Sequence, residues 1–159
     1  MIRKLHHNAY RCRDSEETRR FYQEFLGLPL AEAFEINETK SGRKTSVLHS
    51  FYQLDDGSYL AFFEAPDMPF EFKAQHDYDL HIALEVKHAD LLAMFEKGRR
   101  AGVETRGISD HGFIDSIYFR DPNGYVIELT AKRENHERAM DPETNRARRT
   151  LEDWQQRKA

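Results

Sequence analysis

The order of predicted secondary-structure elements repeats along the chain, and this repeat constrains the fold more than any other feature of the sequence. Residues 3–66 read as a strand, a helix and three strands, and residues 78–131 give the same order although the residues themselves barely match. Two copies of one supersecondary unit can pair and bury their apolar faces together. We therefore predict an α+β fold in which two βαβββ repeats form a curved sheet, or half-barrel, around a cavity lined by strands of both repeats.

Capping signals and apolar patterns place the individual elements. Asp14 and Glu17 form a capping box that begins a helix at about 15–26, and Gly27 can end that helix. The Asp-Asp-Gly sequence at 55–57 predicts a hairpin turn. The other predicted elements are strands at 5–12, 29–36, 44–54, 58–65, 79–86, 103–106, 113–120 and 125–130, and a second helix at 89–102.

The C-terminal part of the chain differs from the rest because it is strongly polar from about Lys132 onward. We therefore predict a domain at 1–131 followed by a polar tail at 132–159. Asp141 and Pro142 are typical of a helix start, so the tail is expected to contain a C-terminal helix. Its apolar residues Leu151 and Trp154 lie three apart on one helix face, which could dock onto the domain or a partner subunit, or fray.

Composition and charge narrow the classes of function. The net charge of -4, with both signs interspersed over 159 residues, gives no reason to expect a nucleic-acid partner. No stretch approaches the roughly 20 consecutive apolar residues that would span a bilayer, so we expect a cytoplasmic protein without a membrane partner. The single cysteine, Cys12, excludes an intrachain disulfide and a Cys-rich zinc site. Any metal ligands must therefore be histidines and carboxylates.

An acidic residue within a predicted strand is the first sign of a site. Glu128 lies among apolar residues of the last predicted strand, where burial of an unpaired carboxylate costs on the order of several kcal/mol. His7 and His81 lie in the first strand of each repeat. Two imidazoles and one carboxylate that leave one side of the ion open are typical of the facial triad that binds Fe(II). The alternative is that each histidine is a hydrogen-bonded strand residue and that Glu128 pairs with an arginine.

Several motifs resemble the vicinal oxygen chelate superfamily, the group that contains glyoxalase I, extradiol dioxygenases and the fosfomycin and bleomycin resistance proteins. The motifs are HNAYRCRD at 7–14, RRFYQEFLGLPL at 19–30, LHIALEV at 80–86 and YFRDPNGYVIEL at 118–129. The resemblance covers about residues 3–131. It implies that His7, His81 and Glu128 are metal ligands and that the protein forms a homodimer.

One stretch resembles the signature of extradiol dioxygenases, in which a histidine, a tyrosine, a D-P-x-G turn and the glutamate ligand follow in order. The matching residues are His111, Ile117, Tyr118, Asp121, Pro122, Gly124 and Glu128, and Ser109 departs at the first position. The resemblance implies that His111 and Tyr118 are catalytic, because an anionic substrate and a developing peroxide need nearby proton donors. The alternatives are an ordinary strand tyrosine and a loop histidine.

Two further departures from the family pattern concern residues around the expected metal. The larger extradiol enzymes carry another catalytic histidine ahead of the second metal histidine, and here only His76 or His49 could replace it. Glyoxalase-like members take a fourth ligand from the last strand of the first repeat. Spacing places Phe62 at that position, and Glu64, two residues later, could be the ligand or form a salt bridge at the strand end.

These residues together predict an extradiol-type ring-cleaving dioxygenase that acts on a small catecholic or otherwise chelating substrate, which we expect to be aromatic. Fe(II) is the expected metal, with Mn(II), Ni(II) or Zn(II) as alternatives, and O₂ is the cosubstrate. Arg11 could neutralise a substrate anion or form a salt bridge, and Phe62 and Phe113 could contact the substrate. The alternative functions are a glyoxalase-like lyase or isomerase, and a non-catalytic resistance protein that binds a small molecule.

Overall fold

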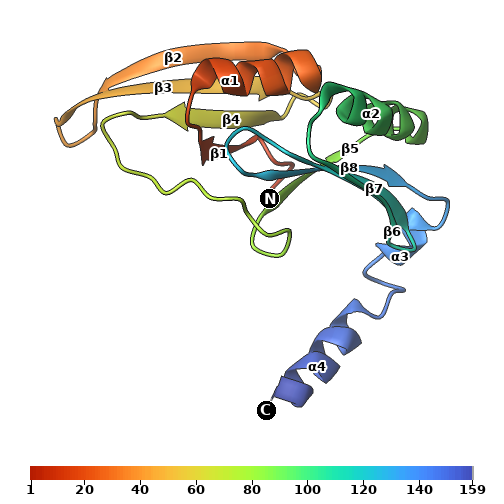
Figure 1. Cartoon of the computed structure of the whole chain (residues 1–159). Helices are drawn as coiled ribbons and strands as arrows, with labels where there is room; N and C mark the ends of the chain where they lie inside the picture. The colour runs from red at the N-terminus through yellow and green to blue at the C-terminus, as the bar shows by residue number, and fades with distance from the viewer. Residues whose placement is uncertain (159) are drawn as a thin grey trace. The chain divides into compact units, whose positions relative to one another are not determined.

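The computed structural model describes residues 1–158, which contain two four-stranded sheets (Figure 1). The strand order is β1-β4-β3-β2 in the first sheet and β5-β8-β7-β6 in the second. The first sheet comprises β1 (His7–Arg11), β2 (Leu30–Glu38), β3 (Lys44–Gln53) and β4 (Tyr59–Glu64), and the second β5 (His81–Glu85), β6 (Thr105–Asp110), β7 (Ile114–Arg120) and β8 (Val126–Lys132). Because both sheets share one order, the predicted α+β fold of two βαβββ repeats is confirmed. Each sheet is open, and neither closes into a barrel.

The chain divides into two compact units whose boundaries differ from those of the repeats. Unit 1 comprises Met1–His81 and Arg120–Val126, and unit 2 comprises Ile82–Phe119 and the chain from Ile127 onward. The turn at 121–124 belongs to unit 1 because it is held there by side chains. The Tyr22 hydroxyl donates to Asp121 Oδ2 at 2.9 Å, and the side-chain oxygen of Asn123 accepts the N–H of Arg13 at 2.8 Å.

The helix of unit 1 forms where the capping signals predict it. α1 (Ser15–Arg19) continues directly into the π-helix η1 (Arg20–Phe25), and the Asp14 side chain accepts the N–H of Glu17. Figure 1 shows α1 across one face of the first sheet. Tyr22 is fully buried, and its ring lies 4.6 Å from that of Phe62 and 5.6 Å from that of Tyr52. These rings form the core between the helix and the sheet.

The two faces of the first sheet therefore carry different residues. Phe62 points toward the helix, so its strand neighbours Ala61 and Phe63 point to the opposite face. β1 runs parallel to β4, with His7 paired to Tyr59 and Arg11 paired to Phe63. Paired residues share a face, so His7 lies on the side of the sheet opposite α1.

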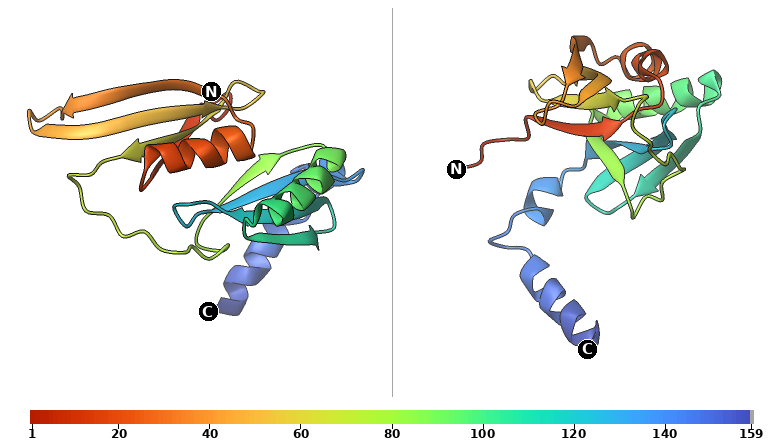
Figure 2. Two further views of the ribbon diagram at one scale, coloured as in Figure 1. Left: turned by 45° about the horizontal axis from the view of Figure 1, so that its top comes forward. Right: turned by 90° about the vertical axis from the view of Figure 1, so that its left-hand side faces the viewer.

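The second sheet is covered on one face by α2 (His88–Ala101) (Figure 2). Leu91 of this helix is fully buried, and a Cβ at Gly98 would lie 2.5 Å from Cε1 of Phe119. Helix and strand approach so closely that only glycine fits at that position. Phe119 therefore faces α2, and Tyr118, the preceding residue of β7, lies on the opposite face.

The C-terminal tail contains two helices, α3 (His136–Ala139) and α4 (Ala147–Lys158). The prediction that the terminal helix begins at Asp141 is wrong. Asp141 heads a turn in which it accepts the N–H of Glu143, and α4 begins at Ala147, whose N–H donates to the Asn145 side chain.

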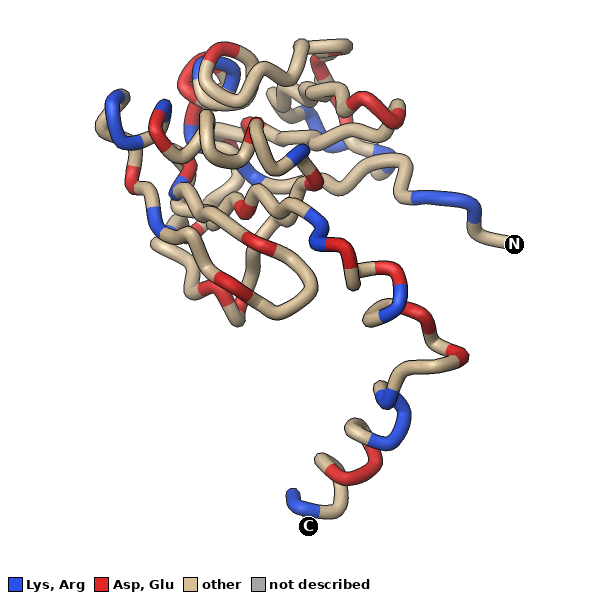
Figure 3. Tube along the Cα trace, turned by 90° about the vertical axis from the view of Figure 1, so that its right-hand side faces the viewer, with Lys and Arg blue, Asp and Glu red and all other residues tan. Residues whose placement is uncertain are grey.

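No residue of α4 is buried within the unit, so the predicted docking of this helix onto the chain's own domain is not observed (Figure 1). Leu151 is 52% exposed and Trp154 is 54% exposed. Lys and Arg alternate with Asp and Glu along the tail (Figure 3). Ala159, the last residue of the predicted tail, lies outside the described residues. Among residues 1–158, no helix has the length and apolar character needed to cross a membrane.

Candidate functional site

A chain of hydrogen bonds on the helix-free side of β7 and β8 joins three of the predicted site residues. Nε2 of His111 lies 2.8 Å from the Tyr118 hydroxyl, which donates to Oε1 of Glu128 at 3.5 Å, the upper limit of such a bond. Because the hydroxyl proton points to the carboxylate, the hydroxyl oxygen accepts the proton of His111 Nε2. Glu128 is 6% exposed, Tyr118 is 9% exposed and His111 is exposed. This series of hydrogen bonds therefore runs from solvent to a buried carboxylate.

Local geometry explains why these side chains meet. His111 lies in the turn between β6 and β7, which closes through the His111 N–H to the carbonyl of Ile114 at 3.0 Å. The following residue, Gly112, has φ of +85°, a conformation that glycine adopts without strain. The guanidinium of Arg106 lies 5.1 Å above the Tyr118 ring, an attractive cation–π contact that holds the ring from the β6 side.

His81 is the first residue of β5 and lies on the face of that strand opposite the buried Ile82 and Leu84. Its Nδ1 lies 2.7 Å from the carbonyl oxygen of Asp77. A carbonyl oxygen only accepts, so Nδ1 carries the proton and the lone pair is on Nε2. This tautomer, oriented by a backbone carbonyl, is the arrangement found in metal-ligating histidines.

His7, the first residue of β1, is exposed and lies beside His6, the residue before the strand. Its Nδ1 is 2.8 Å from Nδ1 of His6, and its ring makes an edge contact with Phe51 at 5.4 Å. One of the two histidines must donate in the Nδ1 pair. The ring of His7 is thus held from two sides.

The three predicted metal ligands are distributed over both units, with His7 and His81 in unit 1 and Glu128 in unit 2. Within the described residues, no group of three or more His, Cys, Asp or Glu side chains is arranged to hold a metal ion. The structure describes each ligand in its own unit, and the shared metal stays a prediction.

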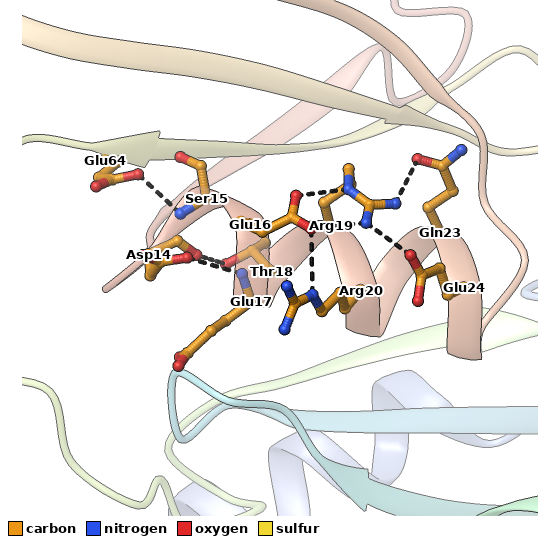
Figure 4. Close-up of polar contacts among 10 residues, drawn as sticks. All are labelled: Asp14, Ser15, Glu16, Glu17, Thr18, Arg19, Arg20, Gln23, Glu24 and Glu64. Carbon is orange, nitrogen blue, oxygen red and sulfur yellow. Dashed lines mark hydrogen bonds and ion pairs between the residues drawn. The ribbon is translucent and has the colours of Figure 1, made fainter.

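Glu64, the possible fourth ligand, is used as a helix cap. Its Oε2 accepts the N–H of Ser15 at 2.7 Å, at the start of α1 where unpaired N–H groups favour a carboxylate (Figure 4). Glu64 and His7 lie on opposite faces of the first sheet, so Glu64 is not placed to share a metal with His7. Phe62, a predicted substrate contact, is fully buried in the core, where its ring packs against Tyr22 on the helix side of the sheet. A shift of one residue exchanges the two faces of a strand, and the spacing pointed to Phe62 whereas Phe63 shares the face of His7.

Arg11 and Phe113, the other predicted substrate contacts, both have structural partners. The Arg11 guanidinium donates to the carbonyls of Ala65 and Met68, at 3.0 and 2.7 Å, and lies over the ring of Phe70. It therefore anchors the loop after β4, and the predicted salt bridge is replaced by backbone contacts. The ring of Phe113 lies 6.0 Å from that of His136, at the beginning of the tail.

The two histidines considered as substitutes for the missing family histidine differ in their surroundings. His49 is 6% exposed, and its Nδ1 lies 3.0 Å from the carbonyl oxygen of Phe62. Its ring stacks on Phe63 at 3.7 Å, and burial lowers its pKa. His76 lies in the loop before β5, where its Nδ1 accepts the N–H of Tyr78. The aromatic setting of His49 was not foreseen, although the alternation along β3 places His49 and Phe51 on one face.

Comparison with known families identifies the fold group. A sequence profile described as the Glyoxalase/Bleomycin resistance protein/Dioxygenase superfamily matches residues 4–129. The chain belongs to this superfamily. A comparison with curated proteins gave no match.

Solved structures of the superfamily are similar in fold. A glyoxylase/bleomycin resistance protein/dioxygenase domain from Frankia sp. EAN1pec is 20% identical, with a TM-score of 0.67 over 86% of this chain and 97% of that one. A glyoxalase/dioxygenase from Nostoc punctiforme is 22% identical, with a TM-score of 0.62 over 83% and 92%. A mutant of the fosfomycin resistance protein FosX from Listeria monocytogenes, complexed with Mn(II) and 1S,2S-dihydroxypropylphosphonic acid, is 21% identical, with a TM-score of 0.59 over 86% and 98%.

Proposed function

We propose that the protein is a divalent-metal enzyme of this superfamily and that His7, His81 and Glu128 hold the metal. The donor set fits such an ion, because two imidazoles and a carboxylate suit Fe(II) and also accept Mn(II). Two observations support it: His81 has the tautomer that places its lone pair on Nε2, and Glu128 is a buried carboxylate on a strand. A bound Fe(II) would make the reaction between substrate and O₂ possible, because amino-acid side chains alone do not activate O₂.

The reaction we propose is extradiol-type ring cleavage of a catecholic substrate, in which both atoms of O₂ enter the product. The observation that carries this proposal is the hydrogen-bonded chain from His111 through Tyr118 to Glu128. A catechol must lose a proton when it binds as an anion, and oxygen insertion needs a proton donor later. His111 is exposed and can exchange protons with solvent, while the Tyr118 hydroxyl is placed to pass a proton or to hold a substrate oxygen near Glu128.

A second candidate is a metal-dependent reaction that needs no O₂. The observation that favours it is the similarity in fold to FosX, whose structure contains Mn(II) and a dihydroxyphosphonate. The same donor set could hold Mn(II) and polarise a substrate oxygen. The non-catalytic alternative, a protein that binds a flat compound without metal, requires that His81→Ala leaves ligand affinity unchanged.

Oxygen consumption separates these candidates. Protein purified without oxygen and loaded with Fe(II) should consume O₂ when mixed with catechols, with loss of the catechol absorbance and formation of a yellow ring-cleaved product. Tyr118→Phe should lower the rate about tenfold to 100-fold while the bound metal is retained.

Tyr10→Phe is a control that should leave the rate unchanged, because it removes a tyrosine hydroxyl from the helix side of the first sheet, opposite His7. No oxygen consumption by fully Fe(II)-loaded protein across varied catechols, together with metal retention, would contradict ring cleavage and favour the O₂-independent candidate.

A further inference from the structure

The face of the first sheet opposite α1 carries a continuous cluster of aromatic rings beside His7. The ring of Phe51 lies 5.4 Å from that of His7 and 4.3 Å from that of His49. Phe63 stacks on His49 at 3.7 Å with an interplanar angle of 12°, and Phe34 lies 5.3 Å from His49. We call Phe34, His49, Phe51 and Phe63 together the aromatic face.

The strand register explains how this face arises. β2 and β3 pair Phe34 with His49, and β3 and β4 pair His49 with Phe63. Three neighbouring strands thus each place an aromatic side chain in one row across the sheet, and Phe51 adds a fourth ring in the next row. Phe34 is 45% exposed at the edge strand, and Phe51 and Phe63 are half-buried. Ring surface is therefore available to a ligand.

His49 gives this face one hydrogen-bond acceptor, the Nε2 atom of its ring. Its Nδ1 faces the carbonyl of Phe62, which only accepts, so Nδ1 carries the proton and Nε2 carries the lone pair. Burial is the main cause that lowers the pKa of His49, and the neutral ring is thereby favoured at pH 7. An acceptor nitrogen within an aromatic cluster selects a ligand that brings both a ring and a donor.

We propose that the aromatic face is the substrate-binding surface beside His7, that it takes a flat aromatic ring bearing a hydroxyl or amino donor, and that His49 determines this specificity. The inference rests on the proposed function in one respect, because it assigns the aromatic face to the same site as His7. The surroundings favour a ring over a small anion. Arg11, the cation that shares the sheet face with His7, donates to backbone carbonyls and lies over Phe70 instead.

Binding of 2-naphthol and naphthalene to the full chain tests this proposal. The two probes share one ring system, and only 2-naphthol carries a donor. Equilibrium dialysis in the presence of a chelator removes any contribution from a metal. The wild-type chain should bind both probes and prefer 2-naphthol by about tenfold, the effect of one hydrogen bond.

Two variants locate the binding surface. Phe34→Ala should weaken the binding of both probes by about threefold to tenfold, as expected for the loss of one ring contact. Leu92→Ala is the matched control, since Leu92 is 43% exposed and lies on α2 in unit 2. His49→Phe keeps a ring but removes the acceptor, so it should abolish the preference for 2-naphthol and leave naphthalene binding unchanged.

Each result has a defined consequence. The proposal that the aromatic face binds the ligand would be overturned if neither probe bound to the wild type, or if Phe34→Ala and Leu92→Ala had equal effects. Retention of the 2-naphthol preference in His49→Phe would overturn the role of His49. If His49→Phe fails to fold, as judged by circular dichroism, the comparison of Phe34→Ala with Leu92→Ala still decides. Metal binding and oxygen consumption are measured separately, so failure of the proposed function is distinguishable from failure of this inference.

Discussion

The two repeats share one strand order but differ in the side chains on the sheet face opposite the helix. In unit 1 that face is aromatic, with Phe34, His49 and Phe51 beside His7. In unit 2 it is polar, and Tyr118 of β7 bonds to Glu128 of β8. The βαβββ arrangement therefore determines where a side chain points, whereas the residue at each position determines which chemistry the face can perform.

The acidic residues of the last strands show the same divergence. Glu64 of β4 lies on the helix side of its sheet and caps α1. Glu128 of β8 is buried on the helix-free side of its sheet, where it accepts a hydrogen bond from Tyr118. Each helix face, in contrast, carries an apolar core, with Tyr22 and Phe62 in unit 1 and Leu91 and Phe119 in unit 2. The cores are therefore alike, and the helix-free faces carry the difference.

The largest expected effect concerns the turns that precede the last strands, which the two repeats build differently. Asp121 is 4% exposed and accepts four hydrogen bonds, from Tyr22, the N–H and side chain of Asn123, and the N–H of Tyr125. Asp121→Ala would leave buried donors unpaired and should lower the free energy of unfolding by about 3 kcal/mol or more.

Asp56 is the matched residue in the turn of the first repeat, where it is exposed and accepts the N–H of Ser58. Asp56→Ala should have a much smaller effect, as measured by urea unfolding of both variants. Equal destabilisation by the two substitutions would contradict the account of a buried turn in one repeat and an exposed turn in the other.

The next effect distinguishes the two glutamates of the last strands. Glu128→Gln removes a negative charge from the proposed metal site and should weaken Mn(II) binding by at least about 100-fold. Glu64→Gln should leave Mn(II) binding unchanged and lower the free energy of unfolding by about 1 kcal/mol, because it weakens the cap of α1. Calorimetric titration and urea unfolding measure the two quantities. A comparable loss of metal affinity in both variants would show that Glu64 is a ligand after all.

The smallest effect depends on pH and concerns the ion pair between Arg133 and Asp115 in unit 2. Hydrogen bonds from Arg133 hold the pKa of Asp115 below its ordinary value of 3.8. A lowered pKa in the folded protein contributes stability above pH 3.8, and this contribution is lost as the pH falls through the folded-state pKa. Arg133→Gln should therefore destabilise the protein at pH 7, with a difference from wild type that shrinks below pH 3.8.

Urea unfolding across that pH range measures this difference, with Arg99→Gln as a control at an exposed helix position. A difference from wild type that stays constant with pH would contradict the role of the pair.

Much of the fold could be predicted from the sequence because its signals are local. The capping box at Asp14 and the alternation along β3, for example, need no knowledge of distant residues. The error at Phe62 arose because family spacing does not determine strand register to within one residue, and one residue exchanges the faces. The start of α4 was misplaced because Asp141 suits a turn as well as a helix cap.

The candidate site was predictable only in part. The pair of His111 and Tyr118 lies within one hairpin, and its hydrogen bond follows from a familiar motif. The hydrogen bond from Tyr22 to Asp121 joins residues far apart in the sequence, and no local sequence pattern predicts it. The burial of His49 among rings depends likewise on the pairing of three strands, which the pattern of one strand does not reveal.

The proposed metal site draws its ligands from both sheets, and a substitution of His7 tests this proposal most directly because His7 is the proposed ligand from the first sheet. Mn(II) binding should be measured by calorimetric titration for the wild-type chain, His7→Ala and the control His88→Ala, which removes an exposed histidine at the start of α2. We predict a loss of at least about 100-fold in Mn(II) affinity for His7→Ala, with His88→Ala close to wild type. Wild-type affinity in His7→Ala, with the protein folded by circular dichroism, would contradict the account.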